Sequence, residues 1–129
     1  MADLGYLNIF ADDIHKMASF YADLFELEEI RESRSPIFRG LRTGKANLGF
    51  NAHDAYALLN LQSFAGSSGV KSFATFNVGE AAEVDRLTPI AVAKGAVLRK
   101  APFTTYYGWY LSVLLDPEGN AFRINFGSG

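Results

Sequence analysis

The sequence predicts an α+β protein built from two tandem copies of one module, each containing a strand, a helix and then three strands. Two observations support this: an alternating strand followed by a helix occurs twice, and each helix is followed by a strand, turn and strand. The 129 residues match the length of a single domain, 1–129. We expect module 1 over about 4–52, a linker over about 53–70 and module 2 over about 71–126.

The first module begins with an alternating strand over 5–11. Asp12 or Asp13 then caps a helix, because a carboxylate accepts from the free N–H groups of a first turn. The helix carries one apolar stripe, formed by Ile14, Met17, Ala18, Tyr21, Leu24 and Phe25. We expect a short, charged strand over 28–33, followed by a strand, turn and strand over 38–51.

The linker contains a possible short helix over 55–59 and a run of small residues over 65–69. The second module then repeats the first. A strand is predicted over 72–78 and a helix from Glu80, with Gly95 as its C-terminal stop.

The chain ends in a predicted hairpin, formed by strands over 108–115 and 121–126 after an earlier strand over 97–106. The turn Asp116-Pro117-Glu118-Gly119-Asn120 contains residues that favour a tight reversal. Alternation in the last strand buries one face under the helices, formed by Phe122, Ile124 and Phe126. Arg123 therefore points to the opposite face.

Composition excludes several functions. The formal net charge of −2 gives no basic surface for nucleic acid, and the absence of cysteine excludes disulfides and thiolate chemistry. No apolar run approaches the ~20 residues of a membrane span, and the N-terminus does not resemble a signal peptide. We expect a cytoplasmic protein with no membrane partner. The terminal 127–129 carries no signal for regular structure.

Two stretches resemble the vicinal oxygen chelate superfamily, which includes glyoxalase I, bleomycin-resistance proteins and extradiol dioxygenases. They are the helix start Asp13-Ile14-His15-Lys16-Met17-Ala18-Ser19-Phe20-Tyr21 and the turn Asp116-Pro117-Glu118-Gly119-Asn120. The resemblance implies two βαβββ modules whose mixed sheets curl around a shared cleft, and it implies a homodimer.

Metal-using members of that family carry His, Gln or Glu on the first and last strand of each module. The resemblance transfers these four positions to Tyr6, Asn47 (or Gly49), Phe73 and Arg123. None supplies the imidazole or carboxylate that a divalent cation needs, and a guanidinium would repel one. We therefore expect no metal, no cofactor and no catalytic residue. His15 and His53 are expected to be surface or loop residues, with His53 alternatively at a pocket rim.

Alternation predicts a face opposite the helices that combines aromatic walls with a few polar groups, as small-molecule pockets do. The candidate ligand-binding residues are Tyr6, Asn8, Asn47, Phe73, Thr75, Trp109 and Arg123. A possible rim is formed by Tyr106, Tyr107, Trp109 and Tyr110. The alternative is that these aromatic side chains only fill the space between two sheets.

We expect a metal-independent protein that resembles bleomycin-resistance proteins and sequesters a small ligand. Arg123 favours an anionic or aromatic ligand over a cationic drug. The first alternative is a glyoxalase- or dioxygenase-like enzyme with a relocated or degenerate metal site. The second is a purely structural dimer module.

Overall fold

The computed structural model describes residues 1–127 as two compact units, one over residues 1–68 and the other from residue 69 onward. Ser128 and Gly129 lie outside the described residues. Each unit contains one mixed sheet and one long helix, of which the first sheet has three strands and the second has four. The predicted α+β class with tandem modules is confirmed.

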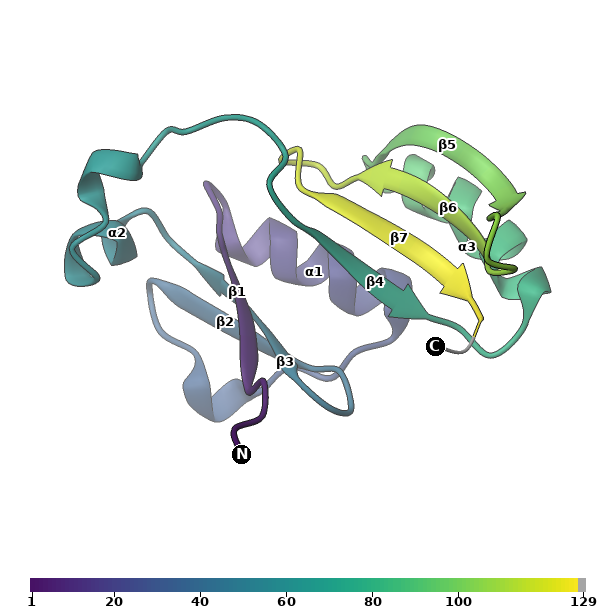
Figure 1. Cartoon of the computed structure of the whole chain (residues 1–129). Coiled ribbons are helices and arrows are strands. Elements are labelled where there is room, and N and C mark those ends of the chain that lie inside the picture. The colour runs from purple at the N-terminus through teal and green to yellow at the C-terminus, as the bar shows by residue number, and fades with distance from the viewer. Residues whose placement is uncertain (128–129) are drawn as a thin grey trace. The chain divides into compact units, whose positions relative to one another are not determined.

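The first unit contains a sheet in the order β1-β3-β2, in which β1 runs parallel to β3 and β2 runs antiparallel to it (Figure 1). Its elements are β1 (Tyr6–Phe10), α1 (Ile14–Phe25), β2 (Phe38–Arg42) and β3 (Asn47–Asn51). Helix α1 packs on β2 and β3. The other face of the sheet therefore carries the side chains that alternate away from α1.

Helix α1 begins where the sequence predicted. The Asp13 side chain accepts a hydrogen bond from the backbone N–H of Lys16 at 2.9 Å, which satisfies a first-turn donor. The helix ends at Glu26, whose φ of 55° is left-handed. The predicted apolar stripe is largely buried, and Tyr21 stacks on Phe50 of β3 with 5.5 Å between ring centroids.

The predicted strand over 28–33 is wrong. The chain forms a single bridge between Glu29 and Leu41 and then a 3-10 helix over Arg31–Ser33. Arg34 reaches back across this turn and donates to both carboxylate oxygens of Glu29, at 2.6 and 2.8 Å. This bond lowers the pKa of Glu29 below its usual value. The bidentate pair between Arg34 and Glu29 thus spans the 3-10 turn, and the strand pairing with β2 does not continue beyond the single bridge.

The segment after β3 contains α2 (Asp54–Leu58) and a 3-10 helix over Gln62–Phe64. Both belong to the first unit. The short helix that the sequence predicted over 55–59 is thus observed one residue earlier. Ala55 is its only buried residue, and several of its neighbours expose large apolar side chains: Leu58, Leu59, Leu61 and Phe64.

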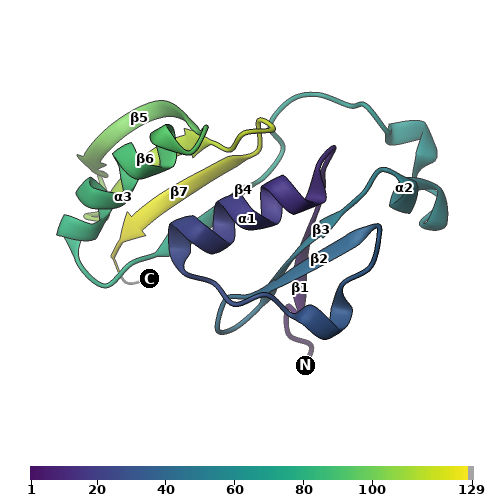
Figure 2. The ribbon, with the colours of Figure 1, turned by 180° about the vertical axis from the view of Figure 1, so that it is seen from behind.

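The second unit contains a sheet in the order β4-β7-β6-β5, with β4 parallel to β7 and the remaining pairs antiparallel (Figure 1). Its elements are β4 (Phe73–Asn77), α3 (Ala81–Ala93), β5 (Val97–Thr104), β6 (Tyr110–Leu115) and β7 (Ala121–Phe126). Helix α3 lies across one face of this sheet, in front of β6 and β7 in Figure 2. It runs through Pro89 and is followed by Gly95, whose φ is 111°.

The strand β7 buries the face that the sequence predicted. Phe122 and Ile124 are fully buried on the α3 side. The prediction for Phe126 is wrong, because its side chain is 41% exposed at the end of the strand. No helix among residues 1–127 is long and apolar enough to cross a membrane.

Candidate ligand-binding face

The face of the second sheet that points away from α3 carries Arg123, and we call it the Arg123 face. Its direction is set by β6, where buried Ser112 shares a hydrogen bond of 2.7 Å with Thr88 of α3. Val113 therefore alternates to the other side. Val113 pairs with Arg123, and Arg123 pairs with Thr75 of β4, so these three side chains form one row on the Arg123 face.

Arg123 is held by neutral groups. Its Nε donates a hydrogen bond to Thr75 Oγ1 at 3.1 Å, and its Nη1 donates one to the hydroxyl oxygen of Tyr107 at 3.0 Å. The guanidinium carbon also lies 4.9 Å from the centroid of the Phe73 ring, a cation–π distance. These contacts fix the guanidinium in place on the sheet without neutralising its charge.

No carboxylate among residues 1–127 forms an ion pair with Arg123. A guanidinium has five N–H donors, and the two hydrogen bonds use two, so three remain without a protein partner in the described part of the chain. A partly buried cation without a counter-charge is costly. The group is therefore suited to an anion that accepts two parallel hydrogen bonds.

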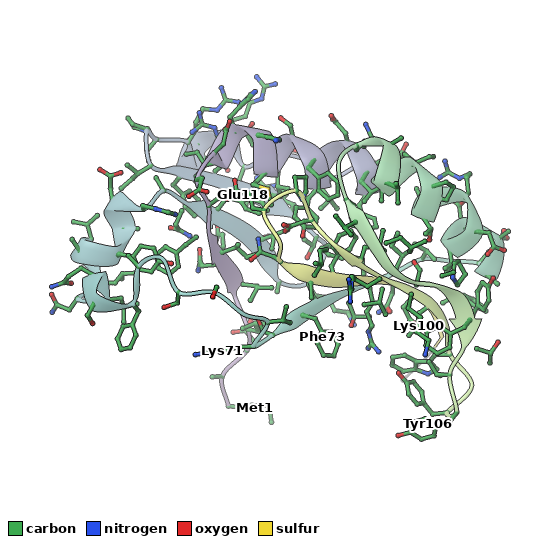
Figure 3. All side chains as sticks on the ribbon, turned by 90° about the horizontal axis from the view of Figure 1, so that it is seen from above. Met1, Lys71, Phe73, Lys100, Tyr106 and Glu118 are labelled. Atoms are coloured by element: carbon green, nitrogen blue, oxygen red, sulfur yellow. The ribbon has the colours of Figure 1, made fainter. Side chains whose placement is uncertain are left out.

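Aromatic side chains from the loop between β5 and β6 lie beside Arg123. The ring of Tyr107 contacts Trp109 with 5.2 Å between centroids, and Tyr106 contacts Tyr107 at 5.0 Å. Trp109 also lies against the backbone of Gly127, where an added Cβ would meet the indole at 2.5 Å. Tyr106, at 100% exposure, projects on the same side of the sheet as Phe73 and Lys100 (Figure 3).

The prediction that Tyr110 joins this rim is wrong. Its hydroxyl donates to Asp85 of α3 at 2.5 Å, so the ring lies on the helix side of the sheet. The hydrogen bond raises the pKa of Tyr110 above its usual value. The register explains the direction, because Tyr110 is two residues from Ser112 and shares its face.

The first sheet also has a face away from its helix, and three predicted site residues lie there. Tyr6 pairs with Asn47, and Asn8 pairs with Gly49. Asn8 accepts a hydrogen bond from Asn51 at 3.0 Å, and a Cβ at Gly49 would collide with Asn8 Oδ1. This glycine therefore leaves room for the Asn8 side chain.

Further along this face, the ring of Phe10 stacks on Tyr56 of α2 with 3.7 Å between centroids. His53 Nε2 lies 2.9 Å from Asp12 Oδ1, and its ring contacts Tyr56 edge-on. His53 thus connects the start of α2 to the end of β1. His15 is exposed on α1, as the sequence predicted.

The structure places the predicted site residues in two groups. Tyr6, Asn8 and Asn47 lie on the first sheet, whereas the second sheet carries Phe73, Thr75, Trp109 and Arg123. Two residues on these faces, Phe38 and Lys100, were not among the residues predicted from the sequence. Phe38 contacts Tyr6 edge-on at 6.1 Å, and Lys100 shares the row of Arg123. Alternation along the strand over 38–42 indicated the face of Phe38, but no pattern indicated that of Lys100.

The side chains at the four inherited ligand positions do not fit a divalent metal. Tyr6 and Asn47 are paired on the first sheet, and Phe73 faces the guanidinium of Arg123 on the second. The pair on the first sheet offers one amide and one phenol oxygen, and the pair on the second offers an aromatic ring and a positive charge. Within residues 1–127, no three His, Cys, Asp or Glu side chains are grouped so that they could hold a metal ion.

Comparison with known proteins supports a family assignment. Residues 3–124 match the model of the Glyoxalase/Bleomycin resistance protein/Dioxygenase superfamily. A crystal structure described as a glyoxalase/bleomycin resistance protein/dioxygenase family enzyme from Burkholderia phytofirmans is 55% identical, with a TM-score of 0.95 over 97% of this chain and 98% of that one.

More distant structures share the fold alone. A hypothetical protein, SA1046 from S. aureus, is 19% identical, with a TM-score of 0.80 over 98% of this chain and 94% of its own. Lactoylglutathione lyase from Agrobacterium tumefaciens is 20% identical, with a TM-score of 0.73 over 98% and 95% of the two chains. No protein with a curated description matches this chain.

Proposed function

This chain belongs to the glyoxalase/bleomycin resistance protein/dioxygenase superfamily, and we propose that it binds a small anionic or aromatic molecule without a metal. Arg123 orients the anionic group of the ligand, and the aromatic side chains around it supply apolar contact. The protein sequesters this molecule as bleomycin-resistance proteins do and performs no reaction on it.

One observation carries the proposal: Arg123 is fixed on the sheet by neutral partners and keeps three N–H donors available. A structural arginine is normally paired with a carboxylate, which offsets the cost of removing its charge from water. Here no carboxylate within residues 1–127 supplies that counter-charge. Phe73 is 57% exposed and Tyr107 is 45% exposed, so both have surface to offer a ligand.

The alternative is a glyoxalase- or dioxygenase-like enzyme whose metal ligands have moved. It is favoured by the description of the 55% identical Burkholderia phytofirmans protein as a family enzyme. An enzyme of this kind would bind its substrate through a metal, so its ligand affinity would depend on the metal content of the preparation.

The test is a titration of Trp109 fluorescence with benzoate and with benzamide. Trp109 is the only tryptophan in the chain and contacts Tyr107, which is hydrogen-bonded to Arg123. We expect saturable quenching by benzoate and at least about tenfold weaker binding of benzamide, because a charged hydrogen bond contributes about 1.5 to 3 kcal/mol. Treatment with a chelator should leave both affinities unchanged.

Two results would contradict the proposal. Equal affinities for benzoate and benzamide would show that the anionic group does not contribute to binding. Loss of benzoate binding after chelation, with recovery on adding zinc, nickel, manganese or iron, would support the enzyme alternative.

We also propose that the protein forms a homodimer. The exposed apolar side chains of Leu58, Leu59 and Phe64 in the first unit, and of Val97 on the edge strand β5, would gain from coverage by a second chain. Sedimentation velocity at micromolar concentration should show twice the 14.1 kDa chain mass. A single 14.1 kDa species would contradict it.

A further inference from the structure

A second cation lies in the same row of the sheet as Arg123. Lys100 of β5 pairs with Val113, Val113 pairs with Arg123, and Arg123 pairs with Thr75. Residues directly opposite one another in a sheet share a face, so Lys100 and Arg123 both project from the Arg123 face. Figure 3 shows Lys100 on the same side of the sheet as Phe73 and Tyr106.

The distance between the two cations suits a single small molecule. Neighbouring strands are about 4.8 Å apart, and Lys100 and Arg123 are separated by two such steps, so their Cα atoms lie about 10 Å apart. The residue between them is apolar Val113, and the next row places Leu111 between Phe103 and Asn125. Leu111 and Asn125 are buried, so the half-buried Val113 supplies the apolar contact between the two charges.

Lys100, like Arg123, can bind an anion because no ion pair within residues 1–127 neutralises its charge. It is exposed, and its Nζ lies 3.9 Å above the centroid of the Phe103 ring, which orients the ammonium without neutralising it. No carboxylate within residues 1–127 forms an ion pair with it. The acidic side chains of this unit belong instead to α3, to its start and to the β6–β7 turn: Glu80, Glu83, Asp85, Asp116 and Glu118.

We propose that the Arg123 face binds a dianionic ligand, with Arg123 and Lys100 each holding one acidic group and the aromatic and aliphatic side chains contacting the body between them. This inference rests on the proposed function and narrows its ligand class to dicarboxylates. Two cations on one side of a sheet, with no ion-paired carboxylate within residues 1–127, repel each other, and a dianion relieves that repulsion at both ends. A monoanion leaves one of them unpaired.

The experiment compares benzoate with benzene-1,3-dicarboxylate and benzene-1,4-dicarboxylate at one low ionic strength, using Trp109 fluorescence. At least one dicarboxylate should bind about tenfold more tightly than benzoate, because it forms a second charge-assisted contact. Lys100→Met should abolish that advantage, so that the dicarboxylates bind no more tightly than benzoate. Lys94→Met is the matched control, since Lys94 caps the end of α3 and lies off the row. It should retain the advantage.

The results distinguish a failure of this inference from a failure of the proposed function. If benzoate binds and depends on Arg123, but the dicarboxylates show no advantage, or keep it in Lys100→Met, this inference is overturned and the proposed function stands. If wild-type protein binds none of the carboxylates, or if Arg123→Met binds all of them as well as wild type, the proposed function fails and this inference fails with it.

Discussion

Replacing Asp116 with alanine should lower the free energy of unfolding by about 2 to 4 kcal/mol, near the upper end for a single substitution. The carboxylate is 2% exposed, and its Oδ1 accepts three hydrogen bonds within the β6–β7 turn. The donors are the backbone N–H of Glu118 at 3.0 Å, that of Asn120 at 2.9 Å and the side chain of Asn120 at 3.1 Å. Alanine would leave these donors without their acceptor, and the losses are not additive.

Asp116→Asn is the matched control. It keeps an oxygen acceptor of the same size and removes the charge, so it should cost clearly less than alanine. Urea unfolding of the three proteins, with the slope held in common, measures both differences. An alanine variant as stable as the wild type would show that turn geometry, set by Pro117 and by Gly119 with its φ of 88°, closes the hairpin without the carboxylate.

Replacing Arg123 with methionine should weaken benzoate binding by about 1.5 to 3 kcal/mol, or roughly 10- to 100-fold. Methionine keeps most of the apolar stem and deletes the charge. Folding stability should stay the same or rise, because the hydrogen bonds to Thr75 and Tyr107 join neutral groups to a cation that has no carboxylate partner within residues 1–127. Fluorescence titration and urea unfolding of the same preparation measure the two effects.

Arg86→Met is the control for this variant, since it removes the same charge from α3, where Arg86 forms an ion pair with Glu83 at 2.5 Å. It should leave benzoate affinity unchanged. A variant at position 123 that unfolds readily while its ligand affinity is retained would show that Arg123 supports the sheet, and our assignment of the ligand-binding face would be wrong.

Much of the fold could be predicted because it depends on short stretches of chain. Asp13 caps α1 through a residue three positions away, and the Asp116 turn closes through residues two and four positions away. Alternation over six residues is enough to send Phe122 and Arg123 to opposite faces of the sheet. These choices use only neighbours along the sequence, so the pattern of residues determines them.

The segment over 28–33 shows where local patterns stop being sufficient. Its charges predict an exposed strand, but Arg34 and Glu29 pair across a 3-10 turn. The same holds for Tyr110, whose position close after three other aromatic residues predicts that it joins the aromatic rim. Its hydroxyl meets Asp85, which is 25 positions away, on the helix side of the sheet.

The sequence by itself determined the tandem modules, the capped start of α1, the closing hairpin and the face on which Arg123 lies. Only the tertiary structure decided what surrounds that arginine. Tyr107 reaches it from a loop 16 residues earlier, and Thr75 reaches it from a strand 48 residues earlier. Lys100 lies between two irregularities in the β5–β6 pairing, one on each side of it along β5. Each irregularity changes which residues of β5 face which side, so alternation could not place Lys100, and the strand register did.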